Sequence, residues 1–324
     1  MPELPEVQTI VDDLNKKIIG RKIVGVWFDA PKLIKKPKPK DLRFKIKDLR
    51  ITEIKRRGKN ILIYLIDCQS SVTNYILLIH QKMTGHLLVG KWDIRKVSSI
   101  KYQVSSLLKG SLEEKVNDYI HLIFYLDDGR QLALSDLRKF AKVLFGEKEE
   151  IENLPELKTL GPEPLDKSFT FEKFKEQILY LCGRVRVAES ASWRRRRAIR
   201  MQKIKQVLMD QNIIAGIGNI YSDEILWLAK IHPFMPAYKL KTHELKNIYS
   251  AMRYILKKAV KLRGTSISDY RDASGKPGNY GKTRLVYRRE GESCRRCKTK
   301  IKRVKIGGRS AHYCPVCQPL VISD

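Results

Sequence analysis

The chain has 324 residues, more than one hydrophobic core usually holds, so we expect two domains. Hydrophobic residues make up 43% of it, which excludes a disordered chain. Lysine and arginine number 65 against 35 acidic residues, and the net charge of +30 favours a nucleic acid as partner. No apolar run is long enough to cross a bilayer, and the first residues lack the basic and apolar stretches of a secretory signal. We therefore expect a cytoplasmic, nucleoid-associated protein.

The first half of the chain predicts a helix followed by a β-rich domain. Apolar residues recur at helical spacing over residues 6–19, and Gly20 ends that helix. Over residues 22–145 the pattern changes to short apolar runs separated by turn residues, which is typical of an antiparallel β-sandwich. Within it, residues 31–40 form a basic, proline-bearing loop and residues 96–118 a polar excursion between strands.

The second half predicts a helical domain that ends in a small β unit. Helical spacing covers four segments, residues 171–181, 199–210, 217–229 and 242–262. A loop rich in Gly, Ser and Asp follows at residues 264–280. Residues 285–317 predict a compact β unit held by a metal ion.

Four of the six cysteines form a pattern that predicts a zinc site. They form two C-x2-C pairs, and the four positions are Cys294, Cys297, Cys314 and Cys317. Thiolates at this spacing place four sulfurs tetrahedrally around one Zn2+ ion, which leaves no open position for a catalytic water. The zinc is therefore predicted to be structural. Arg303, Lys305 and Arg309 lie in the hairpin between the pairs, and its basic tip is expected to meet a phosphate or enter a groove.

A Gly-x-Gly turn at residues 216–218 joins a helix that ends near Asp210 to one that begins at Asn219. Glycine allows close approach to a ligand, and the beginning of a helix offers free N–H groups to an anion. The pattern predicts a helix–two-turns–helix phosphate clamp, although an ordinary connection between two helices has the same local sequence.

The first residues of the chain carry a second chemistry. Removal of Met1, which is normal before a small residue, leaves Pro2 with a free secondary amine. Such an amine can attack the anomeric carbon of a sugar and form an iminium ion, and the Glu3 carboxyl group beside it can move protons. The alternative is that Pro2 and Pro5 only begin a helix.

Several motifs, in one order along almost the whole chain, resemble the formamidopyrimidine-DNA glycosylase family, which shares a superfamily with endonuclease VIII. Leu4 favours the oxidised-purine branch, because endonuclease VIII members usually have glycine there. The motifs are residues 1–7 (MPELPEV), 56–59 (RRGK), 80–85 (HQKMTG), 136–140 (DLRKF), 160–165 (LGPEPL), 216–221 (GIGNIY), 275–278 (GKPG) and the zinc finger.

The resemblance implies a bifunctional glycosylase and AP lyase that removes oxidised purines from duplex DNA. It implies that Pro2 is the Schiff-base nucleophile and Glu3 the proton donor. Lys59 is linked to β-elimination and Arg309 to δ-elimination. Glu6 is similar to an acid that lines the lesion pocket. No organic cofactor or Mg2+ is needed beside the structural zinc, because an amine and acid–base residues suffice.

A further set of residues is implied to contact DNA. Three of them fill the space that the extruded nucleotide leaves, and Asn219 binds a phosphate. Lys276 lies in the loop that covers the flipped base, and Asn117 stands where the family has a histidine. The full set is Met83, Arg138, Phe140, Asn219, Lys205, Lys276, Tyr287 and Asn117.

We therefore expect an α+β monomer that binds lesion-containing DNA in a basic cleft between two domains. Residues 1–150 form an N-terminal helix and antiparallel β-sandwich, and residues 151–168 a linker. Residues 169–284 form the helix–two-turns–helix domain, and residues 285–324 the zinc-finger β-hairpin.

Some positions depart from the family pattern, and other functions stay open. Leu137 and Lys139 replace the usual proline and arginine, so the turn that they share with Arg138 is expected to differ in shape. Residues 183–200 are an insertion with a run of four arginines, either a phosphate-binding arm or a solvated basic helix face.

The alternative functions are an endonuclease VIII-like enzyme for oxidised pyrimidines and a non-catalytic DNA-damage binder that contains zinc. A zinc-ribbon ribosomal or RNA-binding protein explains the charge and cysteines but not the N-terminal motif.

Overall fold

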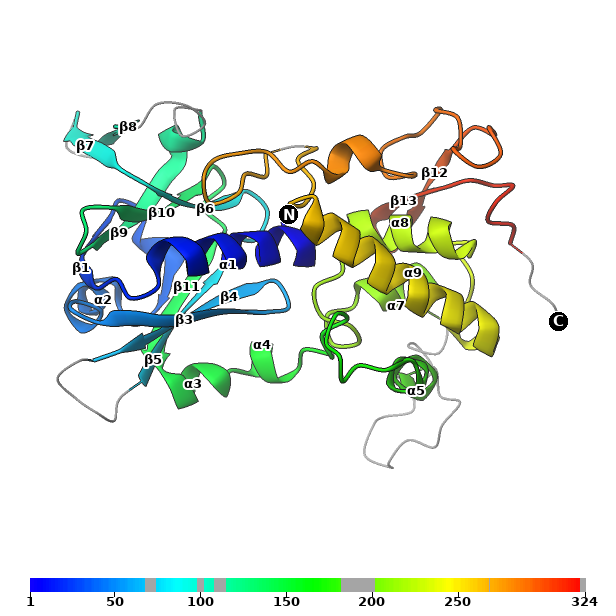
Figure 1. Cartoon of the computed structure of the whole chain (residues 1–324), viewed down its shortest axis with the longest axis horizontal. Helices are drawn as coiled ribbons and strands as arrows, with labels where there is room; N and C mark the ends of the chain where they lie inside the picture. The colour runs from blue at the N-terminus through cyan, green and yellow to red at the C-terminus, as the bar shows by residue number, and fades with distance from the viewer. Residues whose placement is uncertain (68–73, 98–101, 108–114, 182–201, 268, 321–324) are drawn as a thin grey trace. The chain divides into compact units, whose positions relative to one another are not determined.

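The chain divides into two compact units. The computed structural model describes all residues except 68–73, 98–101, 108–114, 182–201, 268 and 321–324 (Figure 1). The first unit comprises Met1–Lys158 and Val260–Gly281, and the second comprises Thr159–Ala259 and Lys282–Asp324. Among the helices that the described residues form, none has the length and apolar character to span a bilayer.

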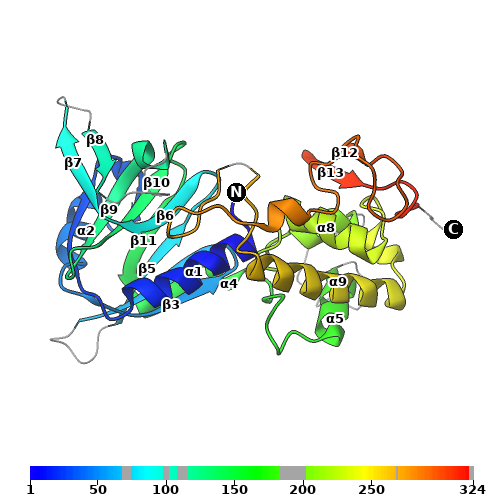
Figure 2. The same ribbon diagram turned by 45° about the horizontal axis from the view of Figure 1, so that its top comes forward.

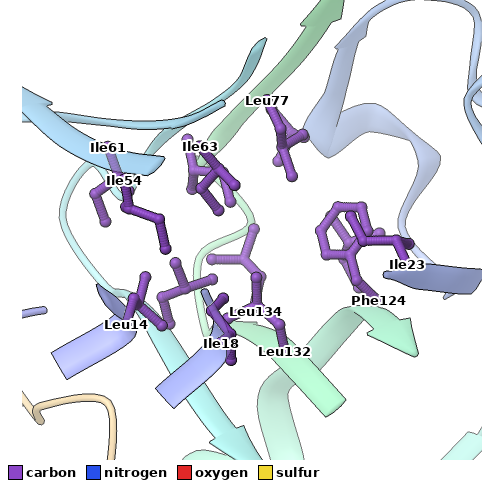
Figure 3. Packing of buried hydrophobic residues seen from close by; sticks show 14 of the residues in the cluster. Leu14, Ile18, Ile23, Ile54, Ile61, Ile63, Leu77, Phe124, Leu132 and Leu134 are labelled. Carbon is purple, nitrogen blue, oxygen red and sulfur yellow. The ribbon is translucent and has the colours of Figure 1, made fainter. Parts of the chain in front are cut away.

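Helix α1 (Leu4–Ile18) opens the first unit and begins two residues before the predicted start. A capping box explains the earlier start, because the backbone N–H of Glu3 donates to Oε2 of Glu6 over 2.9 Å. The apolar face of α1 packs into the main core, where Leu14 and Ile18 point toward strand residues such as Ile54 (Figure 3).

Two sheets enclose that core, as the predicted β-sandwich requires. All pairings are antiparallel except β2–β11, and residues from both sheets share the main core with α1. The strands of the first sheet, in sheet order, are β1 (Ile23–Phe28), β9 (Ile120–Leu126), β10 (Gln131–Asp136) and β6 (Gly85–Gly90). Those of the second are β2 (Ile34–Lys36), β11 (Lys142–Glu147), β5 (Asn74–His80), β4 (Asn60–Ile66) and β3 (Arg50–Arg57).

The two segments predicted as irregular contain regular structure. Residues 31–40 contribute η1 (Pro31–Leu33), β2 and the start of α2 (Pro39–Lys45), because Leu33, Ile34 and Leu42 are drawn into the core. The polar excursion contains much of a hairpin, β7 (Trp92–Lys96) paired with β8 (Tyr102–Ser106), and η3 (Lys115–Tyr119). Trp92 is buried there in a second, smaller apolar cluster.

Residues 260–281 return to the first unit, whereas the sequence suggested a division only at the linker. Tyr270 and Ala273 lie in the main core, and the backbone N–H of Val89 donates to the carbonyl of Ala273 over 2.9 Å. Short helices α3 (Lys148–Glu152) and α4 (Pro155–Lys158) end the first passage through this unit.

The second unit is helical and carries the zinc hairpin. The predicted helices form, although α7 begins at Ile204 and the proposed start at residue 199 lies outside the described residues. The chain leaves this unit within α9, between Ala259 and Val260. It returns within η5 (Tyr280–Thr283), between Gly281 and Lys282. The other elements are α5 (Phe171–Leu181), α7 (Ile204–Met209), α8 (Asn219–Ala229), η4 (Ala237–Lys239), α9 (Thr242–Lys261), β12 (Lys302–Ile306) and β13 (Arg309–Tyr313).

Candidate active site and nucleic-acid contacts

The carboxylate of Glu6 joins the start of the chain to the loop at residues 264–280. Its Oε2 accepts the backbone N–H of Glu3 over 2.9 Å, and its Oε1 accepts that of Thr265 over 2.7 Å. Gly264 has a φ of +78°, and a Cβ there would lie 2.8 Å from Oε1 of Glu6, so this approach requires glycine. Pro2 and Glu3 are both buried. Glu6, predicted to line the lesion pocket, thus holds the candidate nucleophile segment and the loop together.

The environment of the N-terminal amine favours its unprotonated form. Burial lowers the pKa of the Met1 amine below its ordinary value of 8.0, and the Lys59 cation lowers it further, while Glu3 and Glu6 oppose the shift. Lys59 lies at the turn between β3 and β4 and is itself largely buried. An amine must lose its proton before it can attack carbon, so this pKa shift suits a nucleophile.

The loop at residues 264–280 is anchored at several points. The Arg263 guanidinium bridges Asp13 of α1 and Asp272 of the loop, with N–O distances of 2.6 Å to each carboxylate. Hydrogen bonds from Arg263 to these carboxylates raise its pKa above the ordinary value. Oδ1 of Asp272 also accepts the backbone N–H of Lys276, whose side chain is exposed.

The structure brings Met83, Arg138 and Phe140 together on the surface of the first unit. Met83 and Phe140 are 46% and 50% exposed. A guanidinium nitrogen of Arg138 lies 3.2 Å from the sulfur of Met83, and its Cζ lies 4.5 Å from the ring centre of Phe140. The trio predicted to replace an extruded nucleotide therefore forms one apolar and cationic group.

Asp136 shapes the turn that presents this trio, and motif reasoning gave it no role. Its Oδ2 accepts the backbone N–H groups of Phe140 and Ala141, both over 2.7 Å, and its Oδ1 accepts the Thr84 hydroxyl over 2.5 Å. Lys139 adopts a φ of +54° in this turn. A buried carboxylate thus organises the turn in which Leu137 replaces the usual proline.

His80 supports the neighbouring loop and was also not singled out from the sequence. Burial, followed by the Lys82 and Lys59 cations, lowers the pKa of His80 to about 3. The ring is therefore neutral at physiological pH, and its Nδ1 accepts the backbone N–H of Lys82 over 2.9 Å. This bond holds Lys82 at a φ of +54°, directly before Met83.

The helix–two-turns–helix segment has the geometry of an anion site. Helix α8 begins at Asn219, as predicted, directly after Gly218. The Gln211 side chain closes the turn, since its Oε1 accepts the N–H of Gly216 and its Nε2 donates to the carbonyl of Ile217 over 2.7 Å. Asn219 lines a hollow of about 440 Å³, shared with Tyr287, Arg288, Glu290, Arg303, Ser310 and His312. Arg309 is exposed at the start of β13.

Two of the predicted DNA-contacting residues are buried and have protein partners. Lys205 is 1% exposed, and its Nζ donates to Oδ1 of Asp223 over 2.5 Å. Asn117 is buried, and its Oδ1 accepts the indole N–H of Trp92 over 3.0 Å. Direct contact of these two side chains with DNA is therefore no part of the function proposed below.

The four clustered cysteines have the spacing of a zinc site. Their sulfur atoms all lie within 4.8 Å of one another, with 3.9 Å between Cys294 and Cys317 and 3.4 Å between Cys297 and Cys314. Zn–S bonds of about 2.3 Å place tetrahedral sulfurs about 3.8 Å apart, so the set fits one zinc ion. Cys68, Cys182 and the arginine-rich insertion lie outside the described residues.

The fold and these sites define a class: zinc-finger proteins that bind DNA through a helix–two-turns–helix clamp. Family models agree along the chain. Residues 1–143 match the formamidopyrimidine-DNA glycosylase N-terminal domain, residues 160–271 its H2TH domain, and residues 291–320 a zinc finger found in FPG and IleRS. The chain belongs to the formamidopyrimidine-DNA glycosylase family.

Relatives and solved structures cover the chain almost completely. Formamidopyrimidine-DNA glycosylases of Pelotomaculum thermopropionicum and Herpetosiphon aurantiacus are 36% and 34% identical to it, over 98% of this chain and 99% and 100% of theirs. A Lactococcus lactis FPG variant in complex with Fapy-dG DNA is 30% identical with a TM-score of 0.78, over 98% of this chain and 100% of that one. The Lactococcus lactis enzyme with abasic-site DNA is also 30% identical, with a TM-score of 0.77, over 98% and 99%.

Proposed function

We propose that this protein is a base-excision-repair DNA glycosylase and AP lyase for oxidised purines. The observation that carries the proposal is the buried Pro2–Glu3 segment, which the Glu6 carboxylate holds against the loop at residues 264–280. Family membership supports it, as do the Fapy-dG and abasic-site DNA in the Lactococcus lactis structures. Because double-stranded DNA is the substrate, we also propose that the protein acts in the nucleoid.

The chemistry begins with the amine of Pro2, which is freed from its peptide bond when Met1 is removed. The nitrogen forms a bond to C1′ as the bond from C1′ to the base breaks, and the base leaves with the electron pair and gains a proton. Glu3 protonates the ring oxygen of the sugar, which opens to the iminium ion. Pro2 is itself buried, and burial is the main cause that lowers the pKa of the Met1 amine directly before it.

Strand cleavage follows from the iminium ion. In β-elimination the Glu3 carboxylate, which has given its proton to the ring oxygen, takes a proton from C2′, and the 3′ phosphate departs with the electron pair of its bond to C3′. We assign Lys59, as the nearby cation, to this step, in which it stabilises the charge of the departing phosphate. In δ-elimination a proton leaves C4′ and the 5′ phosphate departs, and the Arg309 guanidinium stabilises its charge. The products are a one-nucleotide gap with phosphate ends. Met83, Arg138 and Phe140 occupy the vacated stack during this sequence.

Borohydride trapping on a duplex with 8-oxoguanine opposite cytosine tests the proposal. The wild-type protein, with Met1 removal checked by mass spectrometry, is expected to form a covalent adduct that maps to Pro2. Pro2→Gly and Glu3→Gln are expected to reduce it strongly. An adduct at another residue, or none on any purine lesion or abasic site despite tight DNA binding, would overturn the proposed mechanism and leave a damage binder.

An enzyme for oxidised pyrimidines is the second candidate function. It is kept because a Lactococcus lactis FPG structure, 30% identical to this chain, holds DNA that contains an oxidised pyrimidine. Single-turnover excision from matched duplexes, each with one known lesion, separates the two. Faster release of oxidised purines supports the main proposal, and the reverse order supports the second.

A further inference from the structure

Asp223 is a buried carboxylate that joins three elements of the second unit. It lies in helix α8, four residues after Asn219, and is 1% exposed. Its Oδ1 accepts the Lys205 ammonium of α7 over 2.5 Å. Its Oδ2 accepts both the backbone N–H and the ring Nδ1–H of His312 in β13, each over 2.9 Å. A carboxylate buried away from water needs such donors to remain charged. Breaking any one of these hydrogen bonds is therefore costly.

On one side the network supports the start of the phosphate clamp. The Lys205 ammonium also donates to the Ser222 hydroxyl over 3.0 Å and to the Asn219 carbonyl over 3.4 Å. Its three acceptors therefore all belong to the beginning of α8. This is the part of the helix that carries Asn219, the residue predicted to bind a phosphate, at its positive dipole end.

On the other side the network supports the zinc hairpin. His312 is buried, and its ring packs edge-on against Tyr287 with 5.1 Å between ring centres. Arg309 begins the same strand and pairs with Ile306 across the hairpin turn. That turn lies close to α7, since a Cβ at Gly307 would come within 2.6 Å of Nε2 of Gln206. Figures 1 and 2 both draw β13 beside α8.

We propose that Asp223 is a positioning residue that holds the finger arginine at a set distance from the phosphate clamp. This rests on the proposed function, in which Arg309 stabilises the phosphate that departs in δ-elimination, and on the expectation that Asn219 binds a DNA phosphate. Loss of the His312 bond then leaves DNA binding and Schiff-base formation intact but displaces Arg309. The step that suffers is δ-elimination, in which the bond from C5′ to oxygen breaks and the departing phosphate keeps the electron pair.

The informative variant is His312→Phe. It retains a ring against Tyr287 and the backbone N–H bond to Asp223, and it leaves the Lys205–Asp223 pair intact. On an abasic-site duplex in single turnover, formation of the δ-product is expected to fall about 5- to 10-fold relative to the β-product. This is the size of effect expected from the loss of one charge-assisted hydrogen bond. Borohydride trapping, DNA affinity and zinc content are expected to stay within about twofold of wild type.

Two further variants separate positioning from folding. His312→Asn can place an amide N–H near the former Nδ1, and it is expected to restore part of the δ-product. His243→Phe makes the same exchange at an exposed position of α9 and is the matched control. An unchanged product ratio in folded, zinc-loaded His312→Phe would overturn the inference. A proportional loss of trapping and of both products would also overturn it, because such a loss indicates a purely structural role. Absence of trapping in the wild type instead refutes the proposed function.

Discussion

At the scale of single residues, buried carboxylates hold in place the segments that carry the predicted functional residues. Glu6 accepts backbone N–H groups of Glu3 and Thr265, and Asp136 accepts those of Phe140 and Ala141. Around each buried carboxylate, donors of the protein take the place of water, so the position of the carboxylate is well determined. The exposed residues that are proposed to contact DNA therefore depend for their position on buried acids that do not contact it.

Thr84 offers a test of this dependence, because its hydroxyl links the Met83 loop to Asp136 over 2.5 Å. Thr84→Val removes that hydrogen bond and leaves a similar volume. We expect a loss of about 1 kcal/mol, or about fivefold slower base release in single turnover. Thr84→Ser retains the hydroxyl and is expected to behave as wild type. Equal rates in all three proteins would contradict the role of this link.

Lys59 offers a second test, through the pH dependence of trapping. Burial and the Lys59 cation lower the pKa of the Met1 amine, and we expect the same surroundings to lower the pKa of the Pro2 amine that takes its place when Met1 is removed. Lys59→Met removes the cation, raises that pKa and is expected to shift the rising limb of the pH–rate profile to higher pH. The exposed Lys55 of β3, the strand that precedes the turn, provides the control Lys55→Met. A shift to lower pH, or an equal shift in both variants, would refute this electrostatic account.

At the scale of elements, the zinc hairpin stands on a small apolar cluster. Trp227 of α8 lies there with Val286, Ile301 and two of the cysteines. The Arg296 guanidinium covers its ring, with Cζ 3.9 Å from the ring centre. The metal, the hairpin and the end of α8 are therefore expected to form one cooperative element.

Removal of zinc is expected to open this element and expose Trp227 to water. Chelation should shift tryptophan emission to longer wavelength and weaken DNA binding, because Arg309 loses its support. Readdition of zinc should reverse both changes. Trp227→Phe identifies the reporter among the four tryptophans of the chain. An emission shift of equal size in Trp227→Phe would assign it to another part of the molecule.

At the scale of the whole molecule, the net charge of +30 governs how DNA is bound. Neutralising several phosphates releases counterions, so affinity is expected to fall by ~10³-fold or more between low and moderate salt. Binding titrations of one abasic-site duplex over a series of salt concentrations measure the slope. A flat profile would show that few phosphates are neutralised.

Much of the molecule was predictable because local patterns determine it. Helix α8 begins at Asn219, directly after the Gly-x-Gly turn that the sequence shows, and cysteine spacing alone predicts a tetrahedral zinc site. Alternating apolar runs indicated the sandwich. The strand β2 was missed because its partner, β11, lies more than a hundred residues further along the chain. The β7–β8 hairpin was missed although its two strands are close in sequence, because the polar residues of that segment were interpreted as an excursion between strands.

By itself the sequence determined the family, the zinc ligands and the candidate nucleophile, since each depends on residue type and spacing. Only the tertiary structure decided which partners the polar residues have. Lys205 and Asn117 turn inward to Asp223 and Trp92, and residues 260–281 join the first unit. The physical reason is that burial and hydrogen-bond satisfaction depend on segments distant in sequence, which no local pattern encodes.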